Sequence, residues 1–136
     1  MIFAILITFF AAGAAPLVAS RAGRRTGWIL SLVPAGLFAY FATWIPAIQG
    51  GEIVRVAVDW VPQFGVEFAF VLDGLSLLFA LLITGLGTAI LAYAGAYLEG
   101  NPDIGRFYVS LIAFMGAMLG VVLADDLIAM FVFWEL

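Results

Sequence analysis

The residue best suited to chemistry in this sequence is a glutamate inside an apolar run. Glu135 follows five apolar residues, 130–134, and precedes Leu136. If its helix begins near Leu127 at a membrane surface, Glu135 lies about eight residues in, or about 12 Å deep. That depth is close to the middle of a hydrocarbon core about 30 Å thick. A charge there costs at least about 2.5 kcal/mol, so intramembrane ionisable residues are functional by default.

Glu135 is predicted to load protons. Burial favours the neutral form of a carboxyl group and a nearby Lys or Arg favours the charged form. A basic partner that approaches and retreats would therefore make the residue take up and release a proton. Arg106 begins a helix at the opposite membrane face, and the other Arg residues lie in loops. The partner is expected from beyond Leu136 or from another chain. The alternative role is a structural hydrogen bond between helices.

Three of the aspartates are the other acidic residues with a predicted role. Asp73 opens the run LDGLSLLF and is predicted to cap a helix, because its oxygen can accept backbone N–H bonds at the helix start. One of Asp125 and Asp126 is expected to cap the helix of Glu135, where a carboxylate also suits the helix dipole. The alternative places both at the outer mouth of an ion path, where they raise the local cation concentration.

Composition excludes several classes of function. Hydrophobic residues make up 66% of the 136 residues and charged residues only 10%, so lipid must be the main solvent. The net charge of −4 leaves no basic patch for nucleic acid. The absence of Cys and His removes thiolate nucleophiles and Cys/His metal sites. With no nucleophile–base pair and no phosphate loop, the sequence predicts neither an enzyme nor a bound cofactor or metal.

Five apolar stretches predict an all-α polytopic membrane protein. We expect one membrane domain over residues 1–136, and at about 20 residues per crossing the first four stretches can span a bilayer. The fifth is too short, because a helix that ends in hydrocarbon leaves carbonyl groups unsatisfied, so the natural chain is expected to continue. A GxxxG pattern at Gly116 and Gly120 permits close helix approach. The expected helices cover residues 2–20, 28–48, 74–97, 107–123 and 127–136.

Charge distribution predicts the orientation of these helices. The basic residues Arg21, Arg24 and Arg25 follow the first apolar stretch, whereas a signal peptide carries its charges before the apolar core. The positive-inside rule places these three residues in the cytoplasm and the N-terminus outside. Alternation then places residues 49–73 and the Asp125–Asp126 pair outside, and Arg55 is the one Arg on that side.

The outer segment 52–72 shows a period-two pattern. Apolar residues alternate with polar or small ones on both sides of the tripeptide VPQ. This pattern predicts a β-hairpin with one apolar face, between the second and third helices. An isolated hairpin is marginally stable, so we expect it to lie against helix ends or another protein chain, as a structural clasp. The expected pairs are Trp60 with Phe64, Val58 with Val66, and Val56 with Phe68.

Two long motifs resemble a known family. They are LDGLSLLFALLITGLGTAILAYAGAYLEG and RFYVSLIAFMGAMLGVVLADDLIAMFVFWEL, which together cover roughly residues 70–136. They look like the start of the large A subunit of Mrp-type multisubunit Na⁺/H⁺ antiporters, which is similar in turn to the antiporter-like subunits of respiratory complex I. The segments FMGAMLGVVL and FWEL are the most specific. By this resemblance Glu135 is similar to the essential glutamate of the fifth helix, which pairs with a lysine on a later helix.

The resemblance implies a function and an environment. It implies part of a multisubunit antiporter in the bacterial plasma membrane that exchanges Na⁺ for protons, with other subunits and lipid as partners. A first alternative is a proton-pumping membrane subunit of a complex I-like oxidoreductase, which uses the same glutamate chemistry. A second is a purely structural membrane subunit whose hairpin and small-residue faces brace a partner. Composition and spacing alone do not identify the transported cation.

Overall fold

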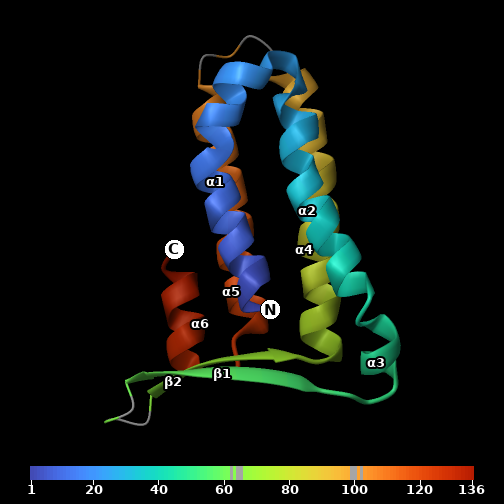
Figure 1. The fold of residues 1–136 in the computed structure, drawn as a ribbon, viewed down its shortest axis with the longest axis vertical. Helices are drawn as coiled ribbons and strands as arrows, with labels where there is room; N and C mark the ends of the chain where they lie inside the picture. Colours follow the sequence, from blue (N-terminus) through green and yellow to red (C-terminus); the bar gives the residue numbers. More distant parts are fainter. Residues whose placement is uncertain (62, 64–65, 99–100, 102) are drawn as a thin grey trace.

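The fold is mostly helical, with one small antiparallel sheet. A computed structural model describes residues 1–61, 63, 66–98, 101 and 103–136 (Figure 1). In chain order the helices and strands are α1 (Ile2–Ala22), the 3₁₀ turn η1 (Gly23–Arg25), α2 (Thr26–Ala42), α3 (Ile45–Gln49), β1 (Val54–Val61), β2 (Val66–Leu72), α4 (Gly74–Tyr97), α5 (Ile104–Leu123) and α6 (Leu127–Trp134).

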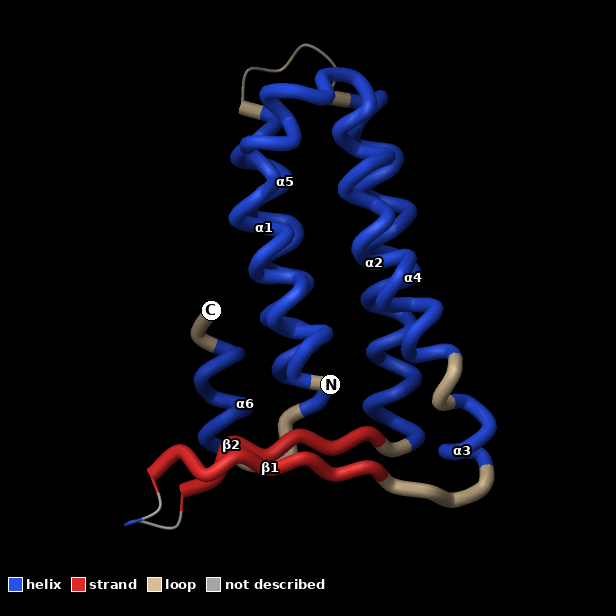
Figure 2. Tube along the Cα trace, viewed as in Figure 1, coloured by secondary structure: helices blue, strands red, loops and turns tan. Residues whose placement is uncertain are grey.

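Four long helices form the body of the molecule. Helix α1 packs along α5 and α2 packs along α4, and the two pairs lie side by side (Figures 1 and 2). Three segments of the described chain are long and apolar enough to cross a membrane: Ile2–Gln49, which contains both α1 and α2, Gly74–Tyr97 and Ile104–Leu123. The predicted helical membrane fold is confirmed at this level, and the number of crossings stays a prediction.

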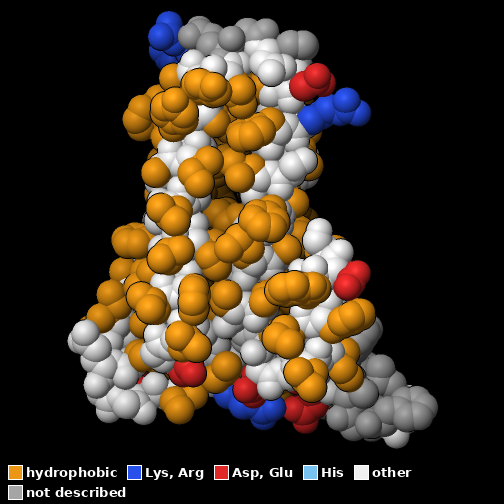
Figure 3. All heavy atoms as spheres, turned by 180° about the vertical axis from the view of Figure 1, so that it is seen from behind, with side chains coloured by type: hydrophobic (Ala, Val, Ile, Leu, Met, Phe, Trp, Pro, Cys, Tyr) orange, Lys and Arg blue, Asp and Glu red, His pale blue; other side chains and the backbone are white. Residues whose placement is uncertain are grey.

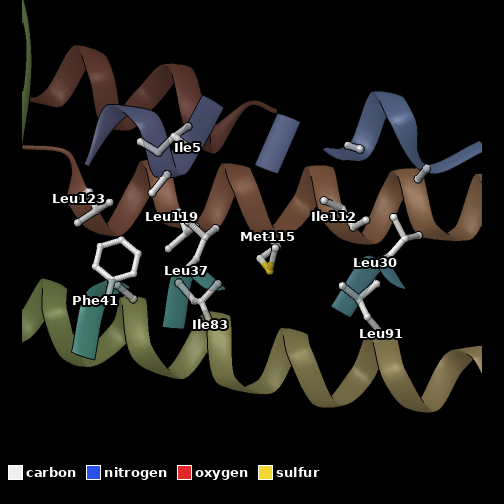
Figure 4. Packing of buried hydrophobic residues seen from close by; sticks show 14 of the residues in the cluster. Ile5, Leu30, Leu37, Phe41, Ile83, Leu91, Ile112, Met115, Leu119 and Leu123 are labelled. Atoms are coloured by element: carbon white, nitrogen blue, oxygen red, sulfur yellow. The ribbon is translucent and has the colours of Figure 1, made fainter. Parts of the chain in front are cut away.

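The space between the four long helices is filled by apolar side chains. Figure 4 shows 14 of them and labels residues from all four helices: Ile5, Leu30, Leu37, Phe41, Ile83, Leu91, Ile112, Met115, Leu119 and Leu123. Two buried threonine hydroxyl groups bond within their own helices: Thr8 Oγ1 donates to the Ile5 carbonyl at 2.6 Å and Thr84 Oγ1 to the Ala80 carbonyl at 2.7 Å. The outer surface is apolar as well, and most charged side chains in Figure 3 lie toward its two ends. This distribution fits a protein solvated by lipid.

The two glycines of the GxxxG pattern contact different helices. A Cβ atom added at Gly116 would lie 2.6 Å from Thr8 Oγ1 on α1. One added at Gly120 would lie 2.2 Å from Cγ of Phe133 on α6. The predicted close approach is therefore confirmed, and α5 uses this one face to contact two different helices.

The strands β1 and β2 form the predicted hairpin with a different register. Val58 pairs with Phe68 and Val56 with Phe70, so the expected pairs Val58–Val66 and Val56–Phe68 are wrong by two residues. The ladder is irregular between Asp59 and Val61, so the connection takes up more residues than the expected tight turn around VPQ. A shift of two keeps every side chain on its expected face. The expected partner of Trp60, Phe64, lies outside the described residues.

The hairpin lies across one end of the helical body, next to the N-terminus (Figure 1). Its strand β2 is the better buried of the two, with Ala69, Phe70 and Leu72 at most 3% exposed.

Near the same end the apolar stretch 28–48 is divided into two helices: α2 ends at Ala42, and α3 starts at Ile45, before Pro46. A proline lacks a donor N–H, which a helix does not need in its first turn, so Pro46 favours the start of a new helix here.

Candidate functional site

Helix α6 carries Glu135 at its carboxyl end. It rises from the hairpin layer beside α5, and the C-terminus lies alongside the middle of the long helices (Figure 1). The Glu135 N–H donates to the Phe131 carbonyl at 3.1 Å, which completes the last turn of the helix. Its side chain is exposed in this chain and forms no ion pair with the described residues. Its burial among further helices, and its role with protons, stay predictions.

A groove of about 370 Å³ runs between α5 and the end of α6. Phe133, Trp134 and Leu136 line it from one side, next to Glu135 in the chain. The other side is formed by α5 residues Phe114, Ala117, Met118, Val121 and Val122. Glu135 is not among the lining residues, although the residues on both sides of it in the chain are.

Asp126 caps α6 and joins it to the hairpin. Its Oδ1 accepts hydrogen bonds from the N–H groups of Ile128 and Ala129, both at 2.8 Å. Its Oδ2 accepts a third from the Ala69 N–H of β2 at 3.0 Å. The predicted cap by one of the two aspartates is thus confirmed for Asp126, and the bond to the hairpin was not foreseen.

Asp125 pairs with the one arginine of the hairpin. The Arg55 Nε donates to Asp125 Oδ2, and the Arg55 Nη2 lies 3.7 Å from Glu67 Oε2. The hydrogen bond and charge of Asp125 hold the pKa of the Arg55 guanidinium above its ordinary value. The Asp125 N–H also donates to the Ala69 carbonyl at 2.9 Å. These contacts are structural, and a contribution of either aspartate to an ion-path mouth stays a prediction.

Asp73 caps α4 through a reciprocal pair of hydrogen bonds. The Ser76 N–H donates to Asp73 Oδ1 at 2.8 Å, and the Asp73 N–H donates to Ser76 Oγ at 2.8 Å. The predicted cap is confirmed, with a serine at the third helical position in the place usual for Glu or Gln. The bond from the Ser76 N–H is the main cause that lowers the pKa of the Asp73 carboxyl below its ordinary value of 3.8.

Replacing Asp73 by alanine is expected to lower stability by about 1 kcal/mol, because the α4 amino end loses its acceptor. The lowered pKa means that the carboxylate stabilises the fold fully above pH 3.8. This stabilisation is lost as the pH falls through the still lower folded-state pKa. Thermal unfolding of the purified full-length protein in detergent, at pH 7 and near pH 3, checks this. Equal midpoints for wild type and Asp73→Ala at pH 7 would contradict it, while Asp73→Asn should retain most of the stability.

The structure places Asp125 and Asp126 at the start of α6, next to the hairpin, but does not bring them to Glu135. Glu135 comes nine positions after Asp126, which corresponds to about 13 Å along the helix axis. Sequence reasoning missed Ala69 as the partner of Asp126, and it missed Phe133 as the α6 residue that contacts the hairpin. The ring of Phe133 lies 6.2 Å from that of Phe68 and 6.0 Å from that of Phe70. The ion pair between Arg55 and Asp125 could have been predicted, because Arg55 is the one basic residue expected on the outer side.

The described residues contain no group of three or more His, Cys, Asp or Glu that could hold a metal ion. The arrangement presents the carboxyl group of Glu135 at the end of a short helix. That helix is held at its amino end by the hairpin and along one side by α5.

Comparison with known proteins identifies relatives along most of the chain. Residues 60–108 match the family described as NADH-Ubiquinone oxidoreductase (complex I), chain 5 N-terminus. The chain is 49% identical over 113 residues to the A subunit of the Na(+)/H(+) antiporter of Alkalihalophilus pseudofirmus, a match that covers 82% of this chain and 14% of the relative. It is 47% identical over 110 residues to the A1 subunit of the Na(+)/H(+) antiporter of Staphylococcus haemolyticus, covering 81% of this chain and 14% of that protein.

Solved structures contain the same fold. A chain of the Mrp complex from Dietzia sp. DQ12-45-1b matches with a TM-score of 0.86 and 35% identity, over 98% of this chain and 14% of the other. A chain of an archaeal membrane-bound sulfane sulfur reductase matches with a TM-score of 0.74 at 22% identity, over 97% and 20% of the two chains, which shows the fold alone. This chain spans about 14% of the length of the antiporter proteins it matches. On this evidence it belongs to the family of the large A subunits of Mrp-type Na⁺/H⁺ antiporters.

Proposed function

We propose that this chain forms part of a multisubunit antiporter that exchanges a monovalent cation, Na⁺, for protons, and that Glu135 takes up and releases the protons. The observation that carries the proposal is the 49% identity over 113 residues to the A subunit of a Na(+)/H(+) antiporter. The proposed partners are the other subunits of a membrane complex, the lipid bilayer, and protons and Na⁺ as transported ions.

Glu135 is the carboxyl group in this chain best suited to the proton step. Its helix starts at the hairpin layer, and its neighbours line an apolar groove. An ionised carboxyl group at membrane depth needs a cation or water beside it, or else it takes up a proton. The described residues provide no cation for it. We propose that a basic side chain from another part of the assembled protein approaches and leaves Glu135 and so drives the exchange of its proton.

The charges at the two ends of the molecule support an orientation in the membrane. Arg21, Arg24 and Arg25 lie around the turn between α1 and α2, at the end opposite the hairpin (Figure 1). Arg106 lies near the start of α5, at the same end. By the positive-inside rule we propose that this end faces the bacterial cytoplasm, and that the N-terminus and hairpin lie outside.

The match of residues 60–108 to a complex I family supports a second candidate. In it, the chain is part of a proton-pumping membrane subunit of a redox-driven complex, and Glu135 performs the same chemistry. The two candidates differ in the energy source, because an antiporter moves protons in response to a cation gradient, whereas a redox pump requires an electron donor.

Everted membrane vesicles from cells without other antiporters test the proposed function. The complete complex is expressed with and without the full-length protein that contains this chain, and a pH-sensitive dye reports the proton gradient. Addition of Na⁺ is expected to dissipate the gradient only when that protein is present. Proton movement that ignores Na⁺ and follows an electron donor through the complex would contradict the proposal and favour the redox pump.

A further inference from the structure

The amino end of α6 is tied to the hairpin by backbone and side-chain contacts. Both main-chain groups of Ala69 are used: its carbonyl accepts from the Asp125 N–H at 2.9 Å, and its N–H donates to Asp126 Oδ2 at 3.0 Å. Phe70 and Ala124 form an antiparallel bridge beside them. Residues 124–126 thus pair with β2 through an isolated bridge and two hydrogen bonds, and they lead directly into α6.

Asp126 determines where α6 begins along its axis. One carboxylate oxygen holds the first N–H groups of the helix and the other holds the hairpin backbone. The ion pair of Asp125 with Arg55 adds a tie to β1. A helix of eight residues has little stability of its own. Its depth in the membrane therefore follows the hairpin.

Phe133 determines how α6 is rotated about its axis. Its ring lies against Gly120 of α5, where any side chain would collide with it, and against the rings of Phe68 and Phe70. Glu135 follows two residues later, and at about 100° per residue it points about 200° away from Phe133. The docking of Phe133 thus turns Glu135 away from α5, in agreement with its exposed side chain.

We propose that the hairpin is the positioning element of the proton site, and that Asp126, through its bond to Ala69, is a positioning residue that sets the depth of Glu135. This inference rests on the proposed role of Glu135. It predicts that changes at the hairpin, about 13 Å from the glutamate along the helix, alter the proton affinity of the site.

The substitution Asp126→Asn separates the helix cap from the hydrogen bond between Asp126 and Ala69. An asparagine oxygen caps a helix about as well as an aspartate oxygen. The amide NH₂ of the asparagine then faces the Ala69 N–H, and because both groups are donors, the hydrogen bond to Ala69 is lost. Asp73→Asn is the matched control, because Asp73 caps α4 in the same way and its carboxylate bonds to Ser76. Both variants are made in the complete antiporter complex, together with Glu135→Gln.

Two measurements report on the proton affinity of Glu135. The first is the pH profile of Na⁺-driven antiport, and the second is the rate at which a hydrophobic carbodiimide modifies Glu135, measured by peptide mass spectrometry. Asp126→Asn is expected to shift the midpoint of the profile by about half a pH unit or more and to change the labelling rate by about threefold, the factor that half a unit represents. Asp73→Asn should leave both unchanged.

Wild-type behaviour of an assembled Asp126→Asn complex in both readouts would overturn the positioning role, provided Glu135→Gln is inactive. Full activity of Glu135→Gln would instead refute the proposed proton site. If Asp126→Asn does not assemble, Arg55→Gln replaces it, because Arg55 is exposed and its only tie to the start of α6 is the ion pair with Asp125, the other being within the hairpin to Glu67. Arg55→Gln is expected to shift both readouts in the same direction, and unchanged values would overturn the proposal.

Discussion

Replacing Glu135 by glutamine is expected to abolish Na⁺-driven proton movement while the complex still assembles. Glutamine keeps the shape of the side chain but cannot release a proton, so a transport cycle that loads protons at this position stops. A positioned acid–base group commonly contributes about a hundredfold or more to a rate, and we expect a loss of at least that size. The measurement is the Na⁺-induced change in the pH gradient of everted vesicles, normalised to the amount of assembled complex.

The control for Glu135→Gln is Glu52→Gln. Glu52 is also exposed in this chain, but it lies between α3 and β1, away from α6. Its substitution should leave transport at the wild-type rate. Full transport by an assembled Glu135→Gln complex would sink the proton-loading role. If Glu135→Gln instead prevents assembly, the hypothesis of a purely structural role gains support.

Replacing Gly27 by alanine is expected to prevent the normal packing of α2 on α4. A Cβ atom at Gly27 would lie 2.6 Å from the Leu91 carbonyl oxygen, 2.8 Å from the Tyr108 hydroxyl and 2.9 Å from the Cα of Gly95. Two of these three atoms belong to the backbone, so relief requires the helices to separate. Overpacking of this kind costs about 1–3 kcal/mol. We expect a lower thermal midpoint of the purified full-length protein and less assembled complex in the membrane.

Gly36 supplies a matched control on the same helix. A Cβ added there meets nothing within 4 Å, so Gly36→Ala should be neutral or should stabilise α2 by about 0.5–1 kcal/mol, because glycine is a poor helix former. The prediction fails if Gly27→Ala and Gly36→Ala have the same thermal midpoint. It also fails if Gly27→Ala alone raises that midpoint.

Local patterns in the sequence predicted the helices and their caps. The apolar stretches became long helices because helix hydrogen bonds join residues four apart and lipid favours any segment that satisfies its own backbone. The caps by Asp73 and Asp126 were predictable for a related reason, since each aspartate bonds to N–H groups two or three residues away. The division of the apolar stretch 28–48 into α2 and α3 was missed, although Pro46 signals it.

Contacts between distant residues decided the rest. The Asp126–Ala69 bond joins positions 57 apart, and the Asp125–Arg55 pair joins positions 70 apart. Period-two alternation gave the correct hairpin faces but not the register, since a shift of two residues leaves the alternation unchanged. Likewise, the GxxxG pattern predicted close packing but not the neighbouring helices. Only the fold shows that Gly116 contacts α1 and that Gly120 contacts α6. Helices and caps can therefore be predicted from the sequence, because their hydrogen bonds join residues close together in the chain. The attachment of α6 to the hairpin could not be predicted, because it depends on how the fold brings distant segments together.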